Sequence, residues 1–297
     1  MAATKMSTTQ RFNELLSNLT LTSAQRETAK TRYEGVTSCL NNYYNGHSST
    51  ILNSLLVGSW GKYTQVRPPR DIDILFELPW SVYSRFSERT GNKQSALLQE
   101  VKSVLATKYT NTEIRADRQV IVVPFVTYAV EVLPAFKFTN GKYWICDTKN
   151  GGSYTTTDPK AEQNAVTDSN TITNGNTRAL IRMAKRWQEF CNVDVKSFHL
   201  ELLAIDFLKG WSHSTKTALF HDWMIRDYFA YLLEKEARYF FVPGTTEFLT
   251  IRNSGWVTKA RMAFSRSKKA IEYDVKELPC LAGEEWQKIF GSFIPKC

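Results

Sequence analysis

The sequence contains no apolar run long enough to cross a membrane. A spanning helix needs about 20 consecutive apolar residues, and no uninterrupted apolar segment of this 297-residue chain approaches that length. Residues 1–5 also lack the apolar core of a secretion signal. We therefore expect a protein that does not enter a membrane and that stays in the cytoplasm.

Cysteine and histidine are too scattered to suggest a disulfide framework or a zinc site. The five cysteines include no C-x-x-C pair and their number is odd, which argues against disulfides and fits a reducing compartment. The four histidines do not pair with these cysteines at zinc-ligand spacings. Any metal is expected to be a hard cation held by oxygen atoms.

Positive charge is in excess, with 38 lysines and arginines against 29 aspartates and glutamates and a formal net charge of +9. This excess favours anionic partners, but charge alone does not separate nucleic acid from free nucleotides. Long nucleic acid is a possible partner that the sequence does not indicate. With 42% hydrophobic residues, the chain can bury a substantial core and form two closely packed lobes.

The apolar periodicity predicts a mixed first half and a helical second half. Residues 119–126 and 128–136 are apolar and β-branched and predict two strands, whereas 51–57 could be a helix end or a strand. Residues 146–176, rich in Gly, Ser, Thr, Asn and Asp, predict a long surface connection between the lobes. Helices are expected within 9–44 (the second starting at an N-cap Ser23), 81–109, 180–187, 200–208, 222–240 and 256–274.

Two carboxylates lie on one face of a predicted strand. In the run Asp71-Ile72-Asp73-Ile74-Leu75-Phe76, the period of two sends both aspartates to one side and the isoleucines into a core. Glu131 is a single acid in an otherwise apolar strand, and burying an unpaired carboxylate is costly. We therefore expect Glu131 to join Asp71 and Asp73 in an acidic cluster.

Small residues upstream of these acids suit a phosphate. Gly58 allows a close backbone approach, and Ser59 offers a hydroxyl and an amide as donors. Three acids and a triphosphate suffice for a pair of Mg²⁺ ions, which stabilise the attacking and leaving oxygens of nucleotidyl transfer. Gly58, Ser59, Asp71, Asp73 and Glu131 thus predict a nucleotidyl-transfer site with two Mg²⁺, or Mn²⁺, ions.

This pattern resembles the active site of DNA polymerase β-like nucleotidyltransferases. Further blocks at 130–136 (VEVLPAF), 156–160 (TTDPK), 180–187 (LIRMAKRW) and 197–203 (SFHLELL) resemble, in order, those of bacterial cyclic oligonucleotide synthases, the cGAS/DncV-like nucleotidyltransferases (CD-NTases) of antiphage CBASS systems. The similarity extends over about residues 57–203. It implies an α+β, two-lobed fold with a mixed-sheet catalytic lobe, residues 1–155 with the N-terminal helix, and a helical lobe, residues 156–297.

The resemblance also implies roles for individual residues. Gly58 and Ser59 would hold the donor triphosphate, and Lys185 and Ser197 would contact its β- and γ-phosphates. Phe198 occupies the place where relatives have a Tyr stacked on the donor base, which keeps stacking but loses a hydroxyl. Glu131 stands where the family more often has Asp, and it would help to activate the attacking ribose hydroxyl. Together these residues imply binding of nucleoside triphosphates in the cleft between the lobes.

The implied activity joins ATP and GTP into a cyclic oligonucleotide second messenger, with a purine cyclic dinucleotide preferred, and releases pyrophosphate. A separate effector protein would read the product, and the enzyme would be a monomer. Two alternatives stay open: a template-independent RNA or small-molecule nucleotidyltransferase of the same fold, and a catalytically silent nucleotide- or nucleic-acid-sensing module. The residues do not decide the bases, the linkage, the ring size or the activating signal.

Several other side chains have weaker signals. Arg178 and Arg182 lie on the same helix face as Lys185 and are expected to form an ordinary solvated face. Ser197 could also cap its helix, followed by Glu201 in the manner of a capping box. The roles of Arg67, Arg70, Gln65 and Tyr154 are not determined by the sequence.

Overall fold

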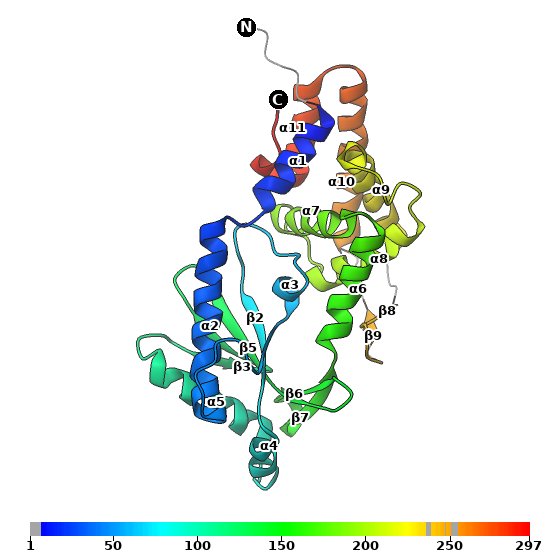
Figure 1. The fold of residues 1–297 in the computed structure, drawn as a ribbon. Helices are drawn as coiled ribbons and strands as arrows, with labels where there is room; N and C mark the ends of the chain where they lie inside the picture. The colour runs from blue at the N-terminus through cyan, green and yellow to red at the C-terminus, as the bar shows by residue number, and fades with distance from the viewer. Residues whose placement is uncertain (1–6, 236–238, 247, 251–254) are drawn as a thin grey trace.

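The fold was analysed in a computed structural model, which describes residues 7–235, 239–246, 248–250 and 255–297. It has two parts, a sheet with helices packed on it and a group of helices, with the chain crossing between them more than once (Figure 1). The sheet is mixed, as the sequence predicts: β2 and β5 are parallel and their other pairings are antiparallel. Within the described residues it has seven strands in the order β1-β2-β5-β4-β3, with β6 beside β5 and β7 beside β6.

The strands of this sheet all lie within residues 54–157 of the chain. They are β1 Ser54–Leu56, β2 Ile72–Glu77, β3 Arg115–Asp117, β4 Val120–Pro124, β5 Ala129–Lys137, β6 Tyr143–Asp147 and β7 Ser153–Thr157. Ile72, Ile74 and Phe76 are fully buried, which confirms the alternation predicted for the aspartate strand. They belong to a core beneath the helices α2 Ser23–Asn45, α4 Trp80–Ser87 and α5 Lys93–Lys108.

A second core holds the helical part together. Its largest fully buried side chains include Trp187, Trp256 and Trp286, so the tryptophans at helical spacing are core residues. The helices are α6 Pro159–Ile172, α7 Asn176–Phe190, α8 Ser197–Gly210, α9 His221–Leu233, α10 Gly255–Val275 and α11 Pro279–Phe290. A two-stranded sheet, β8 Tyr239–Phe241 with β9 Phe248–Thr250, lies between α9 and α10 in the chain.

The N-terminal helical region consists of two helices that serve different cores. The helix α1 Thr8–Leu19 buries Phe12 in the helical part, whereas α2 packs on the sheet. The break between them is stabilised by a capping box, in which Thr22 accepts from the amide of Gln25 and Gln25 accepts from that of Thr22. The N-cap of α2 is therefore Thr22, and the prediction of Ser23 was wrong by one residue.

The predicted surface connection over residues 146–176 was wrong. The Thr-rich run Ser153–Thr157 pairs with β6 as an edge strand, and Asp158 then caps α6 with Pro159 at its first position. Polar composition hid these elements because an edge strand and a surface helix need few apolar residues. The expected division at residue 155 falls within β7, and we propose that the two parts divide after that strand.

Other element boundaries differ in smaller ways. The helical excursion at 81–109 is two helices, α4 and α5, and 51–57 contains the strand β1. The helix expected at 222–240 ends at Leu233, and part of its predicted extension, residues 236–238, lies outside the described residues. None of the described helices is long and apolar enough to cross a membrane.

A disulfide joins Cys280 to Cys297, so the expectation that the cysteines form no disulfide was wrong. The end of the chain runs back along α11 so closely that a Cβ on Gly283 would lie 1.8 Å from the carbonyl oxygen of Lys296. This packing brings the two Cα atoms to 4.6 Å, although 17 residues separate them in the chain. A spacing rule does not detect such a pair, because the approach is made by the tail and not by a local motif.

Candidate active site

Gly58 and Ser59, which we call the phosphate cradle, lie where β1 leads into the four-residue helix α3 Gly58–Gly61. Gly58 has a φ of 56°, and a Cβ there would lie 2.1 Å from Oδ2 of Asp73. Only glycine fits such a position without strain. The amide of Val57 donates to the carbonyl oxygen of Asp73 at 2.9 Å, which ties the cradle to the aspartate strand.

Two of the three predicted acids lie on adjacent parallel strands, and Asp71 directly precedes the first of them. Asp73 on β2 is the register partner of Glu131 on β5, and Oδ1 of Asp71 accepts from the amide of Ala129 at 3.3 Å. Burial, followed by repulsion from Glu131 and Asp71, raises the pKa of Asp73 to about 7. Burial and repulsion from Asp71 and Asp117 also raise the pKa of Glu131. The sheet thus concentrates negative charge at one place, as the sequence predicts.

These carboxylates suit a divalent cation by their chemistry. Asp73 is desolvated beside like charges, and its pKa shows that the ionised form lacks sufficient compensation. The ligand set is not closed: within the described residues, no three His, Cys, Asp or Glu side chains could by themselves hold a metal ion. A divalent cation there would take its remaining ligands from water or from substrate phosphates.

A pocket of about 260 Å³ lies between the two parts of the molecule and collects residues from both. Seven of the eight predicted site residues line it, and Glu131 does not, although it faces Asp73 in the register. The predicted residues are joined there by side chains for which no role was predicted. The lining residues are Gly58, Ser59, Lys62, Thr64, Gln65, Val66, Arg70, Asp71, Asp73, Lys185, Ser197, Phe198 and Glu201.

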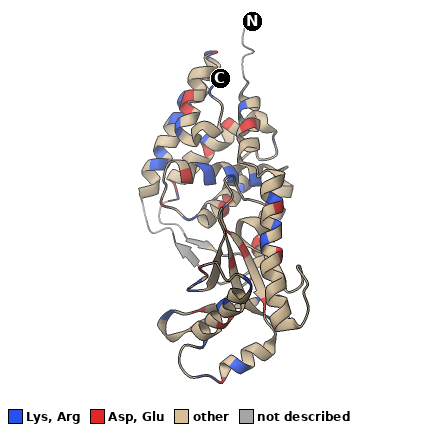
Figure 2. Ribbon diagram, turned by 90° about the vertical axis from the view of Figure 1, so that its left-hand side faces the viewer, with Lys and Arg blue, Asp and Glu red and all other residues tan. Residues whose placement is uncertain are grey.

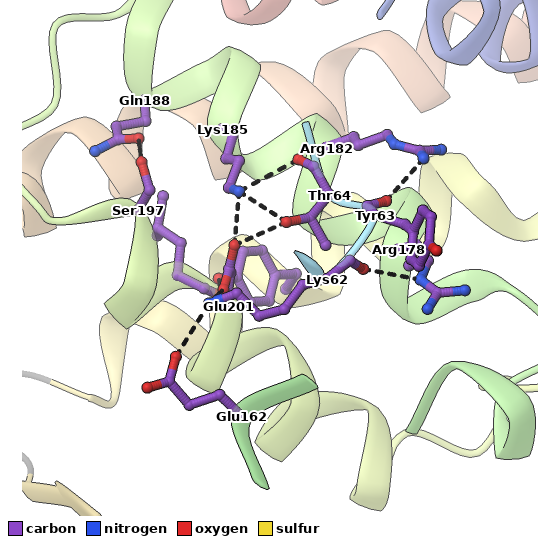
Figure 3. Close-up of polar contacts among 12 residues, drawn as sticks. Lys62, Tyr63, Thr64, Glu162, Arg178, Arg182, Lys185, Gln188, Ser197 and Glu201 are labelled. Carbon is purple, nitrogen blue, oxygen red and sulfur yellow. Dashed lines mark hydrogen bonds and ion pairs between the residues drawn. The ribbon is translucent and has the colours of Figure 1, made fainter. Parts of the chain in front are cut away.

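Lys185 is held inside the pocket by a buried carboxylate. Its Nζ lies 2.6 Å from Oε1 of Glu201 and donates to Oγ1 of Thr64 at 2.9 Å, as Figure 3 shows. The other oxygen of Glu201, Oε2, lies 2.6 Å from Nζ of Lys62, which also reaches Glu162 at 3.5 Å. One acid therefore bridges two lysines that face the cradle.

The charges in this network are set by burial and by their partners. Burial alone would raise the pKa of Glu201, but Lys185 and Lys62 outweigh it and lower that pKa. Burial alone would lower the pKa of Lys62, but Glu201 and Glu162 outweigh it and raise it. Glu201 is thus an anion between cations, which makes it unlike the capping-box residue that the sequence suggested.

Ser197 and Phe198 begin α8 on the far side of the pocket. Ser197 is the first residue of the helix and not its N-cap, which is Lys196, so the capping interpretation was wrong. Its hydroxyl donates to Oε1 of Gln188 at 2.8 Å. Nζ of Lys62 lies 4.6 Å from the centre of the Phe198 ring, a cation-π contact with the ring that is expected to stack on a base.

The sequence analysis missed Lys62 and Glu201. Glu201 lies between Leu200 and Leu202 on α8, a signal like the one that drew attention to Glu131. Tyr154 is not in the site, because it stacks on Trp144 at 5.5 Å within the aromatic core of the sheet. Arg67 donates to the carbonyl oxygen of Asn18 and so braces α1.

Gln65 and Arg70 line the pocket. Oε1 of Gln65 is buried, and no described residue forms a hydrogen bond with it. Arg70 lies 3.5 Å from Glu189 on α7.

A second pocket, of about 550 Å³, shares Phe198 and opens toward β6 and β7. It is lined mainly by polar residues from the β3–β4 hairpin, from β6 and β7 and from the starts of α6 and α8. Two adjoining cavities with Phe198 between them offer room for two ligands side by side.

A mixed sheet with paired aspartates, a Gly-Ser cradle and a lysine from a helical lobe defines a nucleotidyltransferase. Residues 6–170 match the family described as the Second Messenger Oligonucleotide or Dinucleotide Synthetase domain. This match covers more than half of the chain, which therefore belongs to that family. The resemblance found in the motifs is thus confirmed at the level of the family.

Similar proteins agree with this assignment. A probable cyclic nucleotide synthase of Bacillus cereus (strain VD146) is 23% identical in an alignment 279 residues long, which covers 80% of this chain and 81% of that protein. Escherichia coli DncV in its 3′-deoxy GTP-bound form has a TM-score of 0.73 at 15% identity, covering 95% of this chain and 96% of that one. E. coli MS115-1 CdnC with ATP has a TM-score of 0.68 at 18% identity, covering 97% and 98%. These solved structures share the fold.

Proposed function

We propose that this enzyme joins two nucleoside triphosphates, ATP and GTP, into a cyclic dinucleotide and releases pyrophosphate at each of two transfers. The observation that carries the proposal is the pocket between the two parts, where Gly58, Ser59 and the aspartates of the sheet meet Lys185 and Phe198 of the helical part. A site built from both parts can grip a triphosphate at one end and a base at the other.

The cradle and the helical side chains would hold the donor nucleotide. Gly58 leaves room for a phosphate, Ser59 donates to its oxygens, and Lys185 and Ser197 approach from α7 and α8. The ammonium of Lys185 is a compact charge suited to the β- and γ-phosphates. Phe198 would stack on the donor base, next to Lys62.

Asp71, Asp73 and Glu131 would hold divalent cations, which nucleotidyltransferases of this kind generally require; two Mg²⁺ ions, or Mn²⁺ in their place, are proposed. When bound, these ions supply Lewis-acid stabilisation of the charge that develops on the α-phosphate. Glu131 would accept the proton of the attacking ribose hydroxyl. Glu131 is the register partner of Asp73 on the neighbouring strand β2.

The second pocket would hold the acceptor nucleotide. It adjoins the donor pocket at Phe198, so a ribose hydroxyl bound there could face the donor phosphates. Solved relatives illustrate successive complexes of such a reaction: Vibrio cholerae DncV has been determined with a nonhydrolyzable GTP and with the linear intermediate pppA(3′,5′)pG. We propose the same order here, a linear dinucleotide that is then turned round and closed.

The product would be a second messenger in antiphage defence, read by a separate effector protein. E. coli CdnC, which has this fold, has been determined in a complex with a HORMA protein, and a protein partner is therefore part of the proposal. A monomeric enzyme in the cytoplasm completes it.

One assay separates the proposal from its rivals. Purified protein is incubated with radiolabelled ATP and GTP and with Mg²⁺ or Mn²⁺, and the products are treated with phosphatase. A cyclic product resists phosphatase, whereas an RNA-extending enzyme needs an added primer and a silent sensing module forms nothing. Asp71→Asn combined with Asp73→Asn should abolish the product, and undiminished activity of this variant would refute the site.

A further inference from the structure

Three successive backbone carbonyls after the cradle point at one face of α7. Nε of Arg178 donates to the carbonyl oxygen of Lys62 at 3.1 Å, and Nη2 of Arg182 donates to that of Tyr63 at 2.9 Å. Nζ of Lys185 donates to that of Thr64 at 3.2 Å. Figure 3 shows these contacts as successive rungs between the helix and the loop.

We call these three hydrogen bonds the ladder, and the spacing of the basic residues on α7 allows it. Arg178, Arg182 and Lys185 are spaced by four and three residues, which places them on one face. The prediction that the two arginines form an ordinary solvated face was therefore wrong, since both are half-buried against the loop. In Figure 2, basic positions gather along α7 above the sheet, whose strands carry acidic ones.

The loop needs such support. Tyr63 has a φ of 57°, a left-handed conformation that side chains other than glycine rarely adopt. The residue is 60% exposed, so burial does not hold it in this conformation. The ring instead lies 5.2 Å from the guanidinium carbon of Arg178, which adds a cation-π contact to the ladder.

Because α7 binds the three carbonyl oxygens, side chains of the loop face the pocket in their place. With the carbonyl oxygens bound by cations, the side chains of Lys62 and Thr64 line the cavity beside Ser59. The amide of Thr64 also donates to the carbonyl oxygen of Ser59 at 2.9 Å, which closes the loop on the cradle. A carbonyl turned the other way would repel a triphosphate, because both carry negative charge.

We propose that Arg178 and Arg182 are positioning residues for the donor triphosphate, acting through the loop at residues 62–64. Neither arginine lines the pocket, whereas Lys185 does. The helical part thus sets the shape of a phosphate loop that belongs to the sheet. This inference rests on the proposed function for its role in nucleotide binding, but the ladder itself can be tested separately.

The test compares Arg182→Met, which removes the donor, with Arg182→Lys, which keeps a cation within reach of the carbonyl of Tyr63. Arg182→Met should raise the KM for the donor triphosphate about tenfold and leave kcat within about twofold, because the loop is set before chemistry begins. Arg182→Lys should restore most of the wild-type KM. Arg261→Met, a substitution of an exposed arginine on α10, is the matched control and should change nothing.

Hydrogen exchange of the ligand-free protein distinguishes positioning from direct contact. The amides of Tyr63 and Thr64 are hydrogen-bonded within the loop, and they should exchange faster in Arg182→Met. A raised KM with unchanged exchange would overturn the proposal, because Arg182 would then touch the nucleotide itself. An unchanged KM would overturn it as well.

Two further experiments cover a variant that does not fold and an enzyme that forms no cyclic product. If Arg182→Met does not fold, Arg178→Met breaks a different rung and replaces it. If the wild-type enzyme forms no cyclic product, the proposed function fails, and binding of α,β-imido-ATP with Mn²⁺ by calorimetry replaces KM. Weaker binding by the variant would then support the ladder, and equal binding would refute it.

Discussion

Asp73 should make the metal-free protein less stable as the pH rises. Its pKa is about 7 in the folded protein, against an ordinary value of 3.8, chiefly because the carboxyl is buried. Between these two pH values the folded state binds more protons than the unfolded state, so the free energy of unfolding falls as pH increases. Above pH 7 the full penalty of the buried charge is present.

The size of this penalty follows from the two values. The difference between 7 and 3.8 is about three pH units, which corresponds to about 4 kcal/mol. Asp73→Asn keeps the shape of the side chain and removes the charge. In the absence of metal the variant should therefore be more stable than the wild type by up to about 4 kcal/mol at pH 8 and about equal to it near pH 4.

Urea denaturation in EDTA, at several pH values between 4 and 8, measures the effect. Asp168→Asn, which changes an exposed carboxylate on α6, is the matched control and should not follow this trend. The reasoning would be refuted if Asp73→Asn were no more stable than the wild type at pH 8, or if its advantage did not shrink toward pH 4. Catalysis by the stabilised variant should nonetheless be lost, as expected when a site keeps strain for function.

Three further substitutions test other parts of the site. Gly58→Ala places a Cβ 2.1 Å from an oxygen of Asp73, so synthesis should fall at least about a hundredfold; more than a tenth of wild-type activity would contradict the close approach. Glu201→Ala strands two buried ammonium groups and should lower the free energy of unfolding in urea by about 3 kcal/mol, whereas an unchanged midpoint would argue that the bridge is absent. Ser197→Ala removes one donor and should raise the KM for the donor triphosphate about tenfold, with little change in stability; a KM equal to the wild type would remove Ser197 from the phosphate site.

The acidic half of the site could be read from the sequence because its geometry is local. In a strand the side chains alternate, so the order of residues around Asp71 and Asp73 determined which face they share. Gly58 was predicted from its place beside Ser59, where a phosphate could approach the backbone. The structure added two further reasons for glycine there, a positive φ and the close neighbour Asp73. The isolated acid in β5 pointed to Glu131 because a buried charge needs a reason to be there.

The sequence by itself therefore determined the chemistry of the cradle, the pair of aspartates and the family, whereas only the tertiary structure decided how the helical part meets them. Glu201 bridges Lys62 and Lys185, which are more than 120 residues apart in the chain. The sequence predicted a solvated face for Arg178 and Arg182, whereas in the structure both donate to the loop that packs on them. The disulfide at the end of the chain belongs to the same class of feature. Such contacts depend on packing between distant segments, which no local periodicity encodes.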